Sequence, residues 1–229
     1  MHAINHNLSV NAVIFDLDGT LIDSAPIYYQ IIDVVFANLG VPSVPKKTLQ
    51  EAMDDGDFDW DYVLPAHMKN RKTELIDTAR EIIDDIAPPM FRKQNKLIGG
   101  SVETLKLIAA KDLRMGIVTS TPMEYLKIKM IPLEQAGIDK LLEIVITADD
   151  VVDKKPAAEP LVKGSEMLGV ALNKCAYVGD TRVDIRAGKA AGMKTVGVLT
   201  GFDDYDALNN EKPDAIIESI AQLGETLCL

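Results

Sequence analysis

Cysteine is scarce in this chain of 229 residues. Its two cysteines, Cys175 and Cys228, have neither zinc-site spacing nor a secretory context, so we expect no disulfide framework. The first ten residues lack the basic segment and the apolar stretch of a signal peptide. No stretch approaches the roughly 20 apolar residues that cross a bilayer. The sequence therefore predicts a cytoplasmic protein.

Basic residues are also few, with 24 Lys and Arg against 35 Asp and Glu, and the formal net charge is −11. This charge repels nucleic acids and anionic membranes, so we expect neither as a partner. A small phosphorylated metabolite remains a suitable partner, because a bound divalent cation and one lysine can reverse the field locally. Hydrophobic residues make up 47% of the chain, which excludes disordered and fibrous classes. We expect a monomer or a homodimer.

Short apolar runs rich in branched residues alternate with helix-like stretches along most of the chain. The runs are 12–15, 115–118, 144–146, 176–178, 195–199 and 215–217. The helix-like stretches between them include 102–110, 123–136, 158–168 and 185–191. Parallel strands need crossover connections, so this alternation predicts an α/β fold, a Rossmann-like doubly wound parallel sheet. Ligands of such sheets bind beyond the carboxyl ends of the strands.

Residues 24–97 break the alternation, because they have helical periodicity without convincing strand runs. A first helix ends near Gly40 and Pro42, and the apolar residues on one of its faces are Ile27, Ile31, Ile32, Val35, Phe36 and Leu39. A second helix is predicted over 73–86, closed by Pro88 and Pro89. We therefore expect a small α-helical cap domain over 24–97, inserted after the first strand into a core formed by 1–23 and 98–229.

The cap contains an acidic stretch, residues 53–61, that can be interpreted in two ways. As a solvated loop it has no role in binding. If it faces the site instead, it disfavours strongly anionic substrates.

Acidic turns follow two of the predicted strands. Asp16 and Asp18 belong to the segment Asp-Leu-Asp-Gly-Thr, which on its own is also typical of a strand ending in an Asp-Gly turn. Asp180 and Asp184 follow a later strand, where they suit a helix N-cap and a first-turn acid. Their spacing of four also puts both carboxylates on one side of the helix start, so they can converge on a single ion.

Four acids aimed at one point need a cation nearby. Lys155 can supply it, although a solvated lysine before a proline-started helix is the structural alternative. Thr119 lies at a strand tip, where its hydroxyl and the amides of the next turn, beginning at Ser120, can hold a phosphoryl oxygen. Thr121 is interpreted structurally, as a helix N-cap in a capping box with Glu124.

In their order along the chain, these four elements resemble the signature motifs of the haloacid dehalogenase superfamily. The motifs are an Asp-x-Asp-Gly-Thr opening, a strand-end Thr or Ser, a Lys, and a closing Gly-Asp-x-x-x-Asp. The resemblance spans about 12–223 and includes a cap in the position used by the phosphoglycolate phosphatase and phosphomutase branches. Residues 198–202, Leu208 and residues 212–215 resemble the phosphoglycolate phosphatase branch in particular.

The resemblance implies a magnesium-dependent phosphatase acting on a small phosphomonoester. Asp16 is implied as the nucleophile that forms an aspartyl phosphate, and Asp18 as the acid for the leaving group and then the base for water. The residues implied as Mg²⁺ ligands are Asp16, Asp18 through its backbone carbonyl, Asp180 and Asp184. Those implied to bind the phosphoryl group are Thr119, Ser120 and Lys155.

Three other functions use the same fold. A sugar phosphomutase needs the same residues if the phosphate passes to a sugar. A carbon-halide dehalogenase would make Asp18 superfluous, because halide displacement needs no acid for the leaving group. A noncatalytic interaction protein would be expected to lose the acidic cluster, and this sequence keeps every member.

Overall fold

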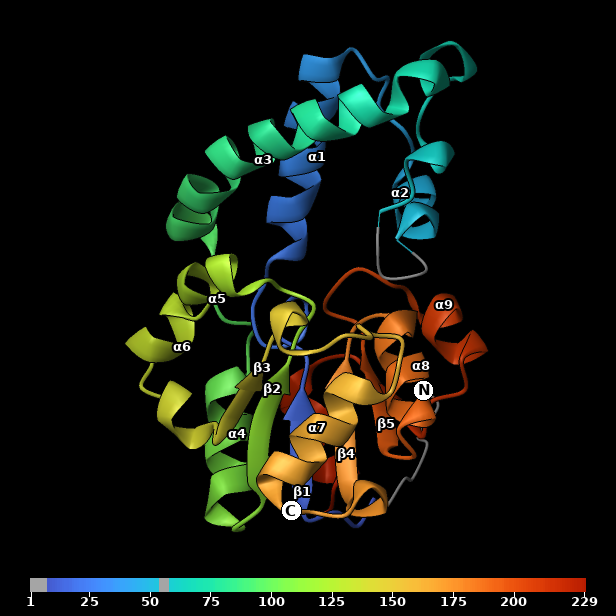
Figure 1. The fold of residues 1–229 in the computed structure, drawn as a ribbon. Helices are drawn as coiled ribbons and strands as arrows, with labels where there is room; N and C mark the ends of the chain where they lie inside the picture. Colours follow the sequence, from blue (N-terminus) through green and yellow to red (C-terminus); the bar gives the residue numbers. More distant parts are fainter. Residues whose placement is uncertain (1–7, 54–57) are drawn as a thin grey trace.

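The computed structural model describes residues 8–53 and 58–229, and its larger part is built around a six-stranded parallel sheet (Figure 1). The order is β3-β2-β1-β4-β5-β6, and each neighbouring pair is parallel. The predicted Rossmann-like fold class is therefore confirmed, and each apolar run coincides with a strand to within one residue. The strands are β1 (Ala12–Phe15), β2 (Arg114–Val118), β3 (Ile144–Ile146), β4 (Cys175–Gly179), β5 (Lys194–Val198) and β6 (Ala215–Ile217).

Helices cover both faces of the sheet. Val13 and Phe15 pack with α4 (Ser101–Ala110), α6 (Ile131–Gln135) and α10 (Leu223–Thr226). Ala12 and Ile14 point to the opposite face, because successive side chains of a strand alternate. There they pack with α7 (Glu159–Leu168) and α8 (Arg182–Ala190). The remaining core helices are α5 (Met123–Lys129) and α9 (Tyr205–Asn210).

The single helix expected over 123–136 is wrong, because α5 and α6 are separate helices that break at Met130. Pro132 lies in the first turn of α6, where its missing N–H costs no helical hydrogen bond. Short 3₁₀ helices complete the described chain at Trp60–Tyr62, Ala66–Arg71, Asp139–Leu141, Ala148–Asp150, Leu172–Lys174 and Ile220–Gln222.

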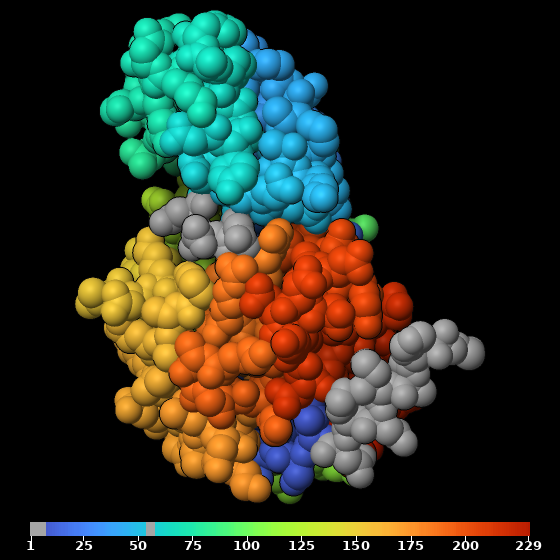
Figure 2. All heavy atoms as spheres, turned by 90° about the vertical axis from the view of Figure 1, so that its right-hand side faces the viewer, coloured from blue at the N-terminus to red at the C-terminus, as the bar shows by residue number. Residues whose placement is uncertain are grey.

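The segment between β1 and α4 forms a second lobe above the core (Figure 2). It consists of α1 (Ala25–Leu39), α2 (Lys46–Ala52), α3 (Lys72–Gln94) and two of the 3₁₀ helices, and its described residues form no strand. It has a hydrophobic cluster of its own. Of the apolar face predicted for the first helix, Ile27, Ile31, Val35 and Phe36 are buried in this cluster, and Ile32 and Leu39 pack against it. This lobe is called the cap below.

The helix expected over 73–86 is longer than predicted, because α3 continues through Pro88 and Pro89 to Gln94. Proline in a helix interior removes a hydrogen bond and costs about 3 kcal/mol or more. Burial offsets this cost here: Ala87 and Phe91 lie in the cap cluster. The Phe91 ring also meets Tyr28 edge-on, with centroids 5.3 Å apart. The two prolines therefore do not end the helix.

The two connections between cap and core run side by side. The backbone N–H of Asp23 donates to the carbonyl of Lys96 at 2.9 Å, and that of Ile98 donates to Leu21 at 3.0 Å. Lys96 and Asp23 also form an ion pair at 3.2 Å. Because the first connection leaves directly after β1, the cap lies over the carboxyl ends of the strands. Within the described residues, no helix is long and apolar enough to cross a membrane.

Part of the acidic stretch of the cap, 54–57, lies outside the described residues. In the described part, the Asp59 and Asp61 side chains are half exposed and pair with Lys72, at 3.7 and 2.6 Å. These two acids thus belong to a solvated surface.

Candidate active site

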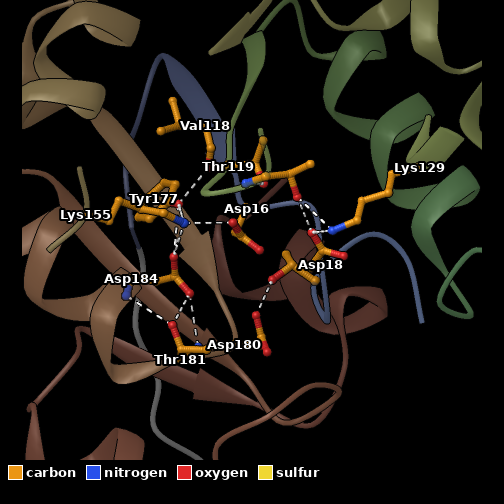
Figure 3. A network of polar contacts seen from close by, with 12 residues as sticks. Asp16, Asp18, Val118, Thr119, Lys129, Lys155, Tyr177, Asp180, Thr181 and Asp184 are labelled. Atoms are coloured by element: carbon orange, nitrogen blue, oxygen red, sulfur yellow. Dashed lines mark hydrogen bonds and ion pairs between the residues drawn. The ribbon is translucent and has the colours of Figure 1, made fainter. Parts of the chain in front are cut away.

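The loops at the carboxyl ends of the strands bring the predicted site residues together (Figure 3). Asp16 follows β1, Thr119 follows β2, Asp180 follows β4, Asp184 lies in the first turn of α8, and Lys155 precedes α7. All five are buried, with at most 7% of each residue exposed. Residues more than a hundred positions apart in the sequence thus form one polar cluster.

Lys155 bridges two of the acids. Its Nζ donates to Asp16 Oδ1 and to Asp184 Oδ1, both at 2.7 Å, and to the Tyr177 hydroxyl at 2.9 Å. Burial alone would lower the pKa of Lys155, but Asp16 and Asp184 raise it well above the usual value. The side chain is therefore a fixed ammonium group beside Asp16.

Asp16, Asp180 and Asp184 form a cluster that could hold a metal, since one oxygen of each lies within 4.8 Å of the others. Burial raises the pKa of Asp16 to about 7, against the attraction of Lys155 and with the help of Asp184 and Asp18. Burial, followed by the charges of Asp184 and Asp16, also raises the pKa of Asp180 well above its usual value. A divalent cation would relieve this excess of negative charge, and hard carboxylate oxygens suit Mg²⁺.

Two glycines make room for Asp180. A Cβ at Gly201 would lie 1.8 Å from Asp180 Oδ2, and one at Gly19, where φ is +76°, would lie 2.3 Å from it. The same Oδ2 accepts the backbone N–H of Phe202 at 2.8 Å, and Oδ1 accepts the Thr20 hydroxyl at 3.3 Å. Asp180 is thus held in a slot that only glycine leaves open.

Asp184 lies in the first turn of α8, as predicted, and its two oxygens have different partners. It forms a capping box with Thr181, whose backbone N–H and hydroxyl donate to Asp184 Oδ2 at 3.1 and 2.6 Å. Its other oxygen faces Lys155 in the cluster. The N-cap of α8 is Thr181, so the interpretation of Asp180 as the cap is wrong.

The turn after β2 lies beside Asp16. The backbone N–H of Thr119 donates to Ile146 at 2.9 Å, and its hydroxyl accepts from the backbone N–H of Thr121 at 3.1 Å. Ser120 is exposed and lines the same pocket as Thr119 and Asp16. These two residues therefore face the space next to the acidic cluster.

Asp18 has a buried cation of its own, Lys129, which the sequence interpretation missed. Lys129 Nζ donates to Asp18 Oδ2 at 2.7 Å, to Thr121 Oγ1 at 2.8 Å and to the Tyr28 hydroxyl. The Thr121 hydroxyl in turn donates to Asp18 Oδ2 at 2.7 Å. Asp18 Oδ1 is buried and has no hydrogen-bond partner among the described residues. One oxygen of Asp18 is thus fixed, and the other remains available.

The interpretation of Thr121 as a helix cap is wrong, because Pro122 takes the N-cap position of α5 and Thr121 points to Asp18. One sequence signal for Lys129 existed. In the helix expected over 123–136, Lys129 lies three residues after Leu126 and four before Leu133, a spacing that places it among the apolar residues of one face. A lysine on such a stripe is unusual unless it has a buried partner.

A pocket of about 730 Å³ lies between the cap and these residues. Its core side includes Asp16, Asp18, Thr119 and Lys155. The cap reaches the core beside it, where the Gln50 side chain donates to the carbonyl of Phe202. The Phe202 ring also packs edge-on against Tyr28, with centroids 5.5 Å apart. The arrangement is a covered acidic site with an ammonium group on each side.

Comparisons with known proteins show which family and fold this chain resembles. The family model described as haloacid dehalogenase-like hydrolase matches residues 13–198. A phosphoglycolate phosphatase of Escherichia coli (strain K12) is 32% identical over 239 residues, covering 96% of this chain and 93% of the relative. A phosphoglycolate phosphatase of Yersinia pestis is 30% identical over 216 residues, covering 94% of this chain and 92% of the relative. The crystal structure of a predicted phosphoglycolate phosphatase from Haemophilus somnus 129pt superposes with a TM-score of 0.79 at 20% identity, covering 93% of this chain and 96% of that one.

Proposed function

The chain belongs to the haloacid dehalogenase-like hydrolase family and is a phosphatase, and we propose that it cleaves a phosphomonoester by forming a phosphate ester on Asp16. The observation that carries the proposal is the position of Asp16, which lies buried beside Lys155 and the acids Asp180 and Asp184. The phosphoglycolate phosphatases of E. coli and Y. pestis make phosphoglycolate the first substrate to test.

In the first step Asp16 attacks phosphorus through the oxygen that Lys155 does not hold. A bond forms between this oxygen and phosphorus, and the bond from phosphorus to the ester oxygen breaks. Lys155 Nζ lies 2.7 Å from Asp16 Oδ1 and fixes the orientation of the Asp16 carboxylate. The product of the step is an aspartyl phosphate and a free alcohol.

Asp18 supplies the proton that the leaving oxygen needs. In the second step Asp18 takes a proton from water, whose oxygen forms a bond to phosphorus while the bond from phosphorus to the Asp16 oxygen breaks. Phosphate is released, Asp16 returns to a carboxylate, and Asp18 has recovered the proton that it gave in the first step. The contacts of Asp18 suit this exchange, because Lys129 and Thr121 fix Oδ2 while Oδ1 lacks a partner among the described residues.

Residues of the turn after β2 would hold the phosphoryl oxygens. We assign this binding to Thr119, Ser120 and Lys155, which line the pocket next to Asp16. Their hydroxyls and the ammonium group would stabilise the negative charge of the transferring group as it passes through the transition state.

The donor set fits magnesium. The proposed ligands are a carboxylate oxygen of Asp16, the backbone carbonyl of Asp18, Asp180, and Asp184 directly or through water. When bound, the ion would neutralise charge on the phosphoryl oxygens. Thr20 and Phe202 hold the Asp180 carboxylate in place. Burial first, and then the neighbouring acids, raise the pKa values of Asp16 and Asp180, and a bound cation would favour their charged forms.

The cap is proposed to be residues 24–97, joined to the core by the paired segments around Asp23 and Lys96. Its place above Asp16 and Asp18 suits a domain that excludes bulk water and contacts the leaving group. The substrate preference of the enzyme would then depend on the cap side of the pocket.

The experiment is phosphate release from a panel of phosphomonoesters, with magnesium and with a chelator. We expect turnover that needs magnesium and that falls at least 1,000-fold in Asp16→Asn, since the nucleophile is lost. Circular dichroism of the variant controls for its fold. Absence of phosphate release from the whole panel, or normal turnover by Asp16→Asn, would overturn the proposal.

A further inference from the structure

The cap side of the pocket is apolar and aromatic. The half-buried apolar residues that line it from the cap include Ile32, Phe58, Ile76 and Ile83, and the buried Ile31, Val35, Phe36 and Trp60 lie behind them. The Trp60 ring packs against Phe36 and Phe58, with centroids 6.2 and 5.3 Å apart. An apolar wall of this kind favours a ligand that presents an apolar surface to it.

This wall lies on the side of the site where the leaving group must be. Asp18 is the residue proposed to protonate the leaving oxygen, so the alcohol extends past Asp18 and not past Lys155. Lys129, which binds Asp18, lies 4.7 and 5.0 Å from the ring centroids of Tyr28 and Phe91. Both rings line the pocket. The leaving group therefore enters an aromatic part of the cap.

The described lining offers little positive charge for an anionic leaving group. Lys155 is bound to Asp16 and Asp184 inside the cluster. Arg182 pairs with Asp203 at 3.2 Å. On the cap wall, Arg80 has a side chain that is 72% exposed and lies 3.4 Å from Asp77. A carboxylate placed against the apolar wall would lose its hydration without gaining a buried partner.

The size of the pocket leads to the same conclusion. Its volume of about 730 Å³ lies in the range of roughly 300–1,000 Å³ that is typical of sites for drug-sized ligands. A two-carbon acid would leave most of the apolar wall without contact. A ring attached to the ester oxygen through a short chain would cover it.

We propose that the preferred substrates are phosphate monoesters of uncharged alcohols that carry an aromatic or bulky apolar group, which binds against the cap wall formed by the half-buried side chains of Ile32, Ile76 and Ile83. The proposal rests on the proposed function, and it names the class of leaving group. It separates this chain from its relatives named as phosphoglycolate phosphatases, since glycolate is small and anionic.

The test compares kcat/KM for three alkyl phosphates at saturating magnesium: 2-phenylethyl phosphate, ethyl phosphate and phosphoglycolate. We expect 2-phenylethyl phosphate to exceed each of the other two at least ten-fold. Equal values, or a preference for phosphoglycolate, would overturn the substrate class while leaving the phosphatase intact. No phosphate release from any of the three would instead contradict the proposed function.

A matched pair of variants on α3 locates the preference. Ile83 lines the pocket, whereas Ile82, which is also half-buried and packs against the cap cluster, does not line it. Ile83→Arg should lower kcat/KM for 2-phenylethyl phosphate about ten-fold relative to phosphoglycolate. Ile82→Arg should leave the ratio as it is. The two variants should have the same melting temperature. If they do, and Ile83→Arg still has the wild-type ratio of kcat/KM between the two substrates, the assigned wall is wrong.

Discussion

Lys129 Nζ lies 2.7 Å from Asp18 Oδ2, in an ion pair whose side chains are only 2% and 14% exposed. The same ammonium group contacts the Tyr28 hydroxyl, so it links α5 of the core, the loop after β1 and the first helix of the cap. Burial alone would lower the pKa of Lys129, but Asp18 and Tyr28 raise it above the usual value. The lysine is thus a charged group that positions Asp18 beneath the cap.

Replacing this lysine should harm both stability and turnover. Lys129→Met leaves Asp18 without its buried partner, which is expected to cost about 3–5 kcal/mol in the free energy of unfolding. Because Oδ2 is no longer fixed, we expect kcat to fall about 100-fold with a smaller change in KM. Urea denaturation and steady-state kinetics measure the two effects. The control is Lys127→Met, an exposed lysine on the same helix. Equal kcat in the two variants would contradict the assigned role.

Gly201 should be needed for metal binding, although it carries no ligand atom. In Gly201→Ala the new Cβ meets Asp180 Oδ2, 1.8 Å away in the present geometry, so the carboxylate must move. Displacing a metal-ligand support commonly costs 10–100-fold in affinity, and we expect a rise of about this size in the magnesium concentration for half-maximal activity. Gly99→Ala is the control, because nothing lies within 4 Å of its Cβ. An unchanged magnesium requirement in Gly201→Ala would contradict the ligand set.

The stability of the chelated protein should fall as pH rises. Burial raises the pKa of Asp16 from 3.8 to about 7, so its folded form binds a proton more tightly than its unfolded form. Its contribution to the free energy of unfolding is therefore complete below pH 3.8 and is lost as pH rises through about 7. The raised pKa of Asp180 acts in the same direction.

Urea denaturation between pH 5 and 8, with chelator and with magnesium, measures this dependence. We expect magnesium to stabilise the protein more at pH 8 than at pH 5, because protons compete with the ion for the same carboxylates. Asp16→Asn should show a smaller loss of stability in chelator. A chelated protein that becomes more stable over this range would show that the cluster is not strained by its charge.

Local patterns predicted the core of this protein well. The branched runs identified all six strands because each strand is buried in the sheet. The parallel order then brought Asp16, Lys155 and Asp180 to one edge, because the carboxyl ends of parallel strands lie together. The cytoplasmic location and the oligomeric state, monomer or homodimer, stay predictions.

Contacts that depend on distant partners were not predictable in the same way. Pro88 and Pro89 indicate a helix end locally, but α3 passes through them because Phe91 packs against Tyr28 on another helix. The sequence around Thr121 matches a capping box, but the Thr121 hydroxyl donates to Asp18, 103 positions away in the sequence. In both cases tertiary packing outweighed the local preference.

The central claim is that phosphate is carried on Asp16, and trapping the intermediate tests it most directly. Acid quenching during turnover, followed by borohydride reduction, converts an aspartyl phosphate to homoserine, which peptide mass spectrometry can locate. We expect homoserine at position 16 only when substrate and magnesium are both present. Reduction at another carboxylate under those conditions, with position 16 still aspartate, would contradict the account.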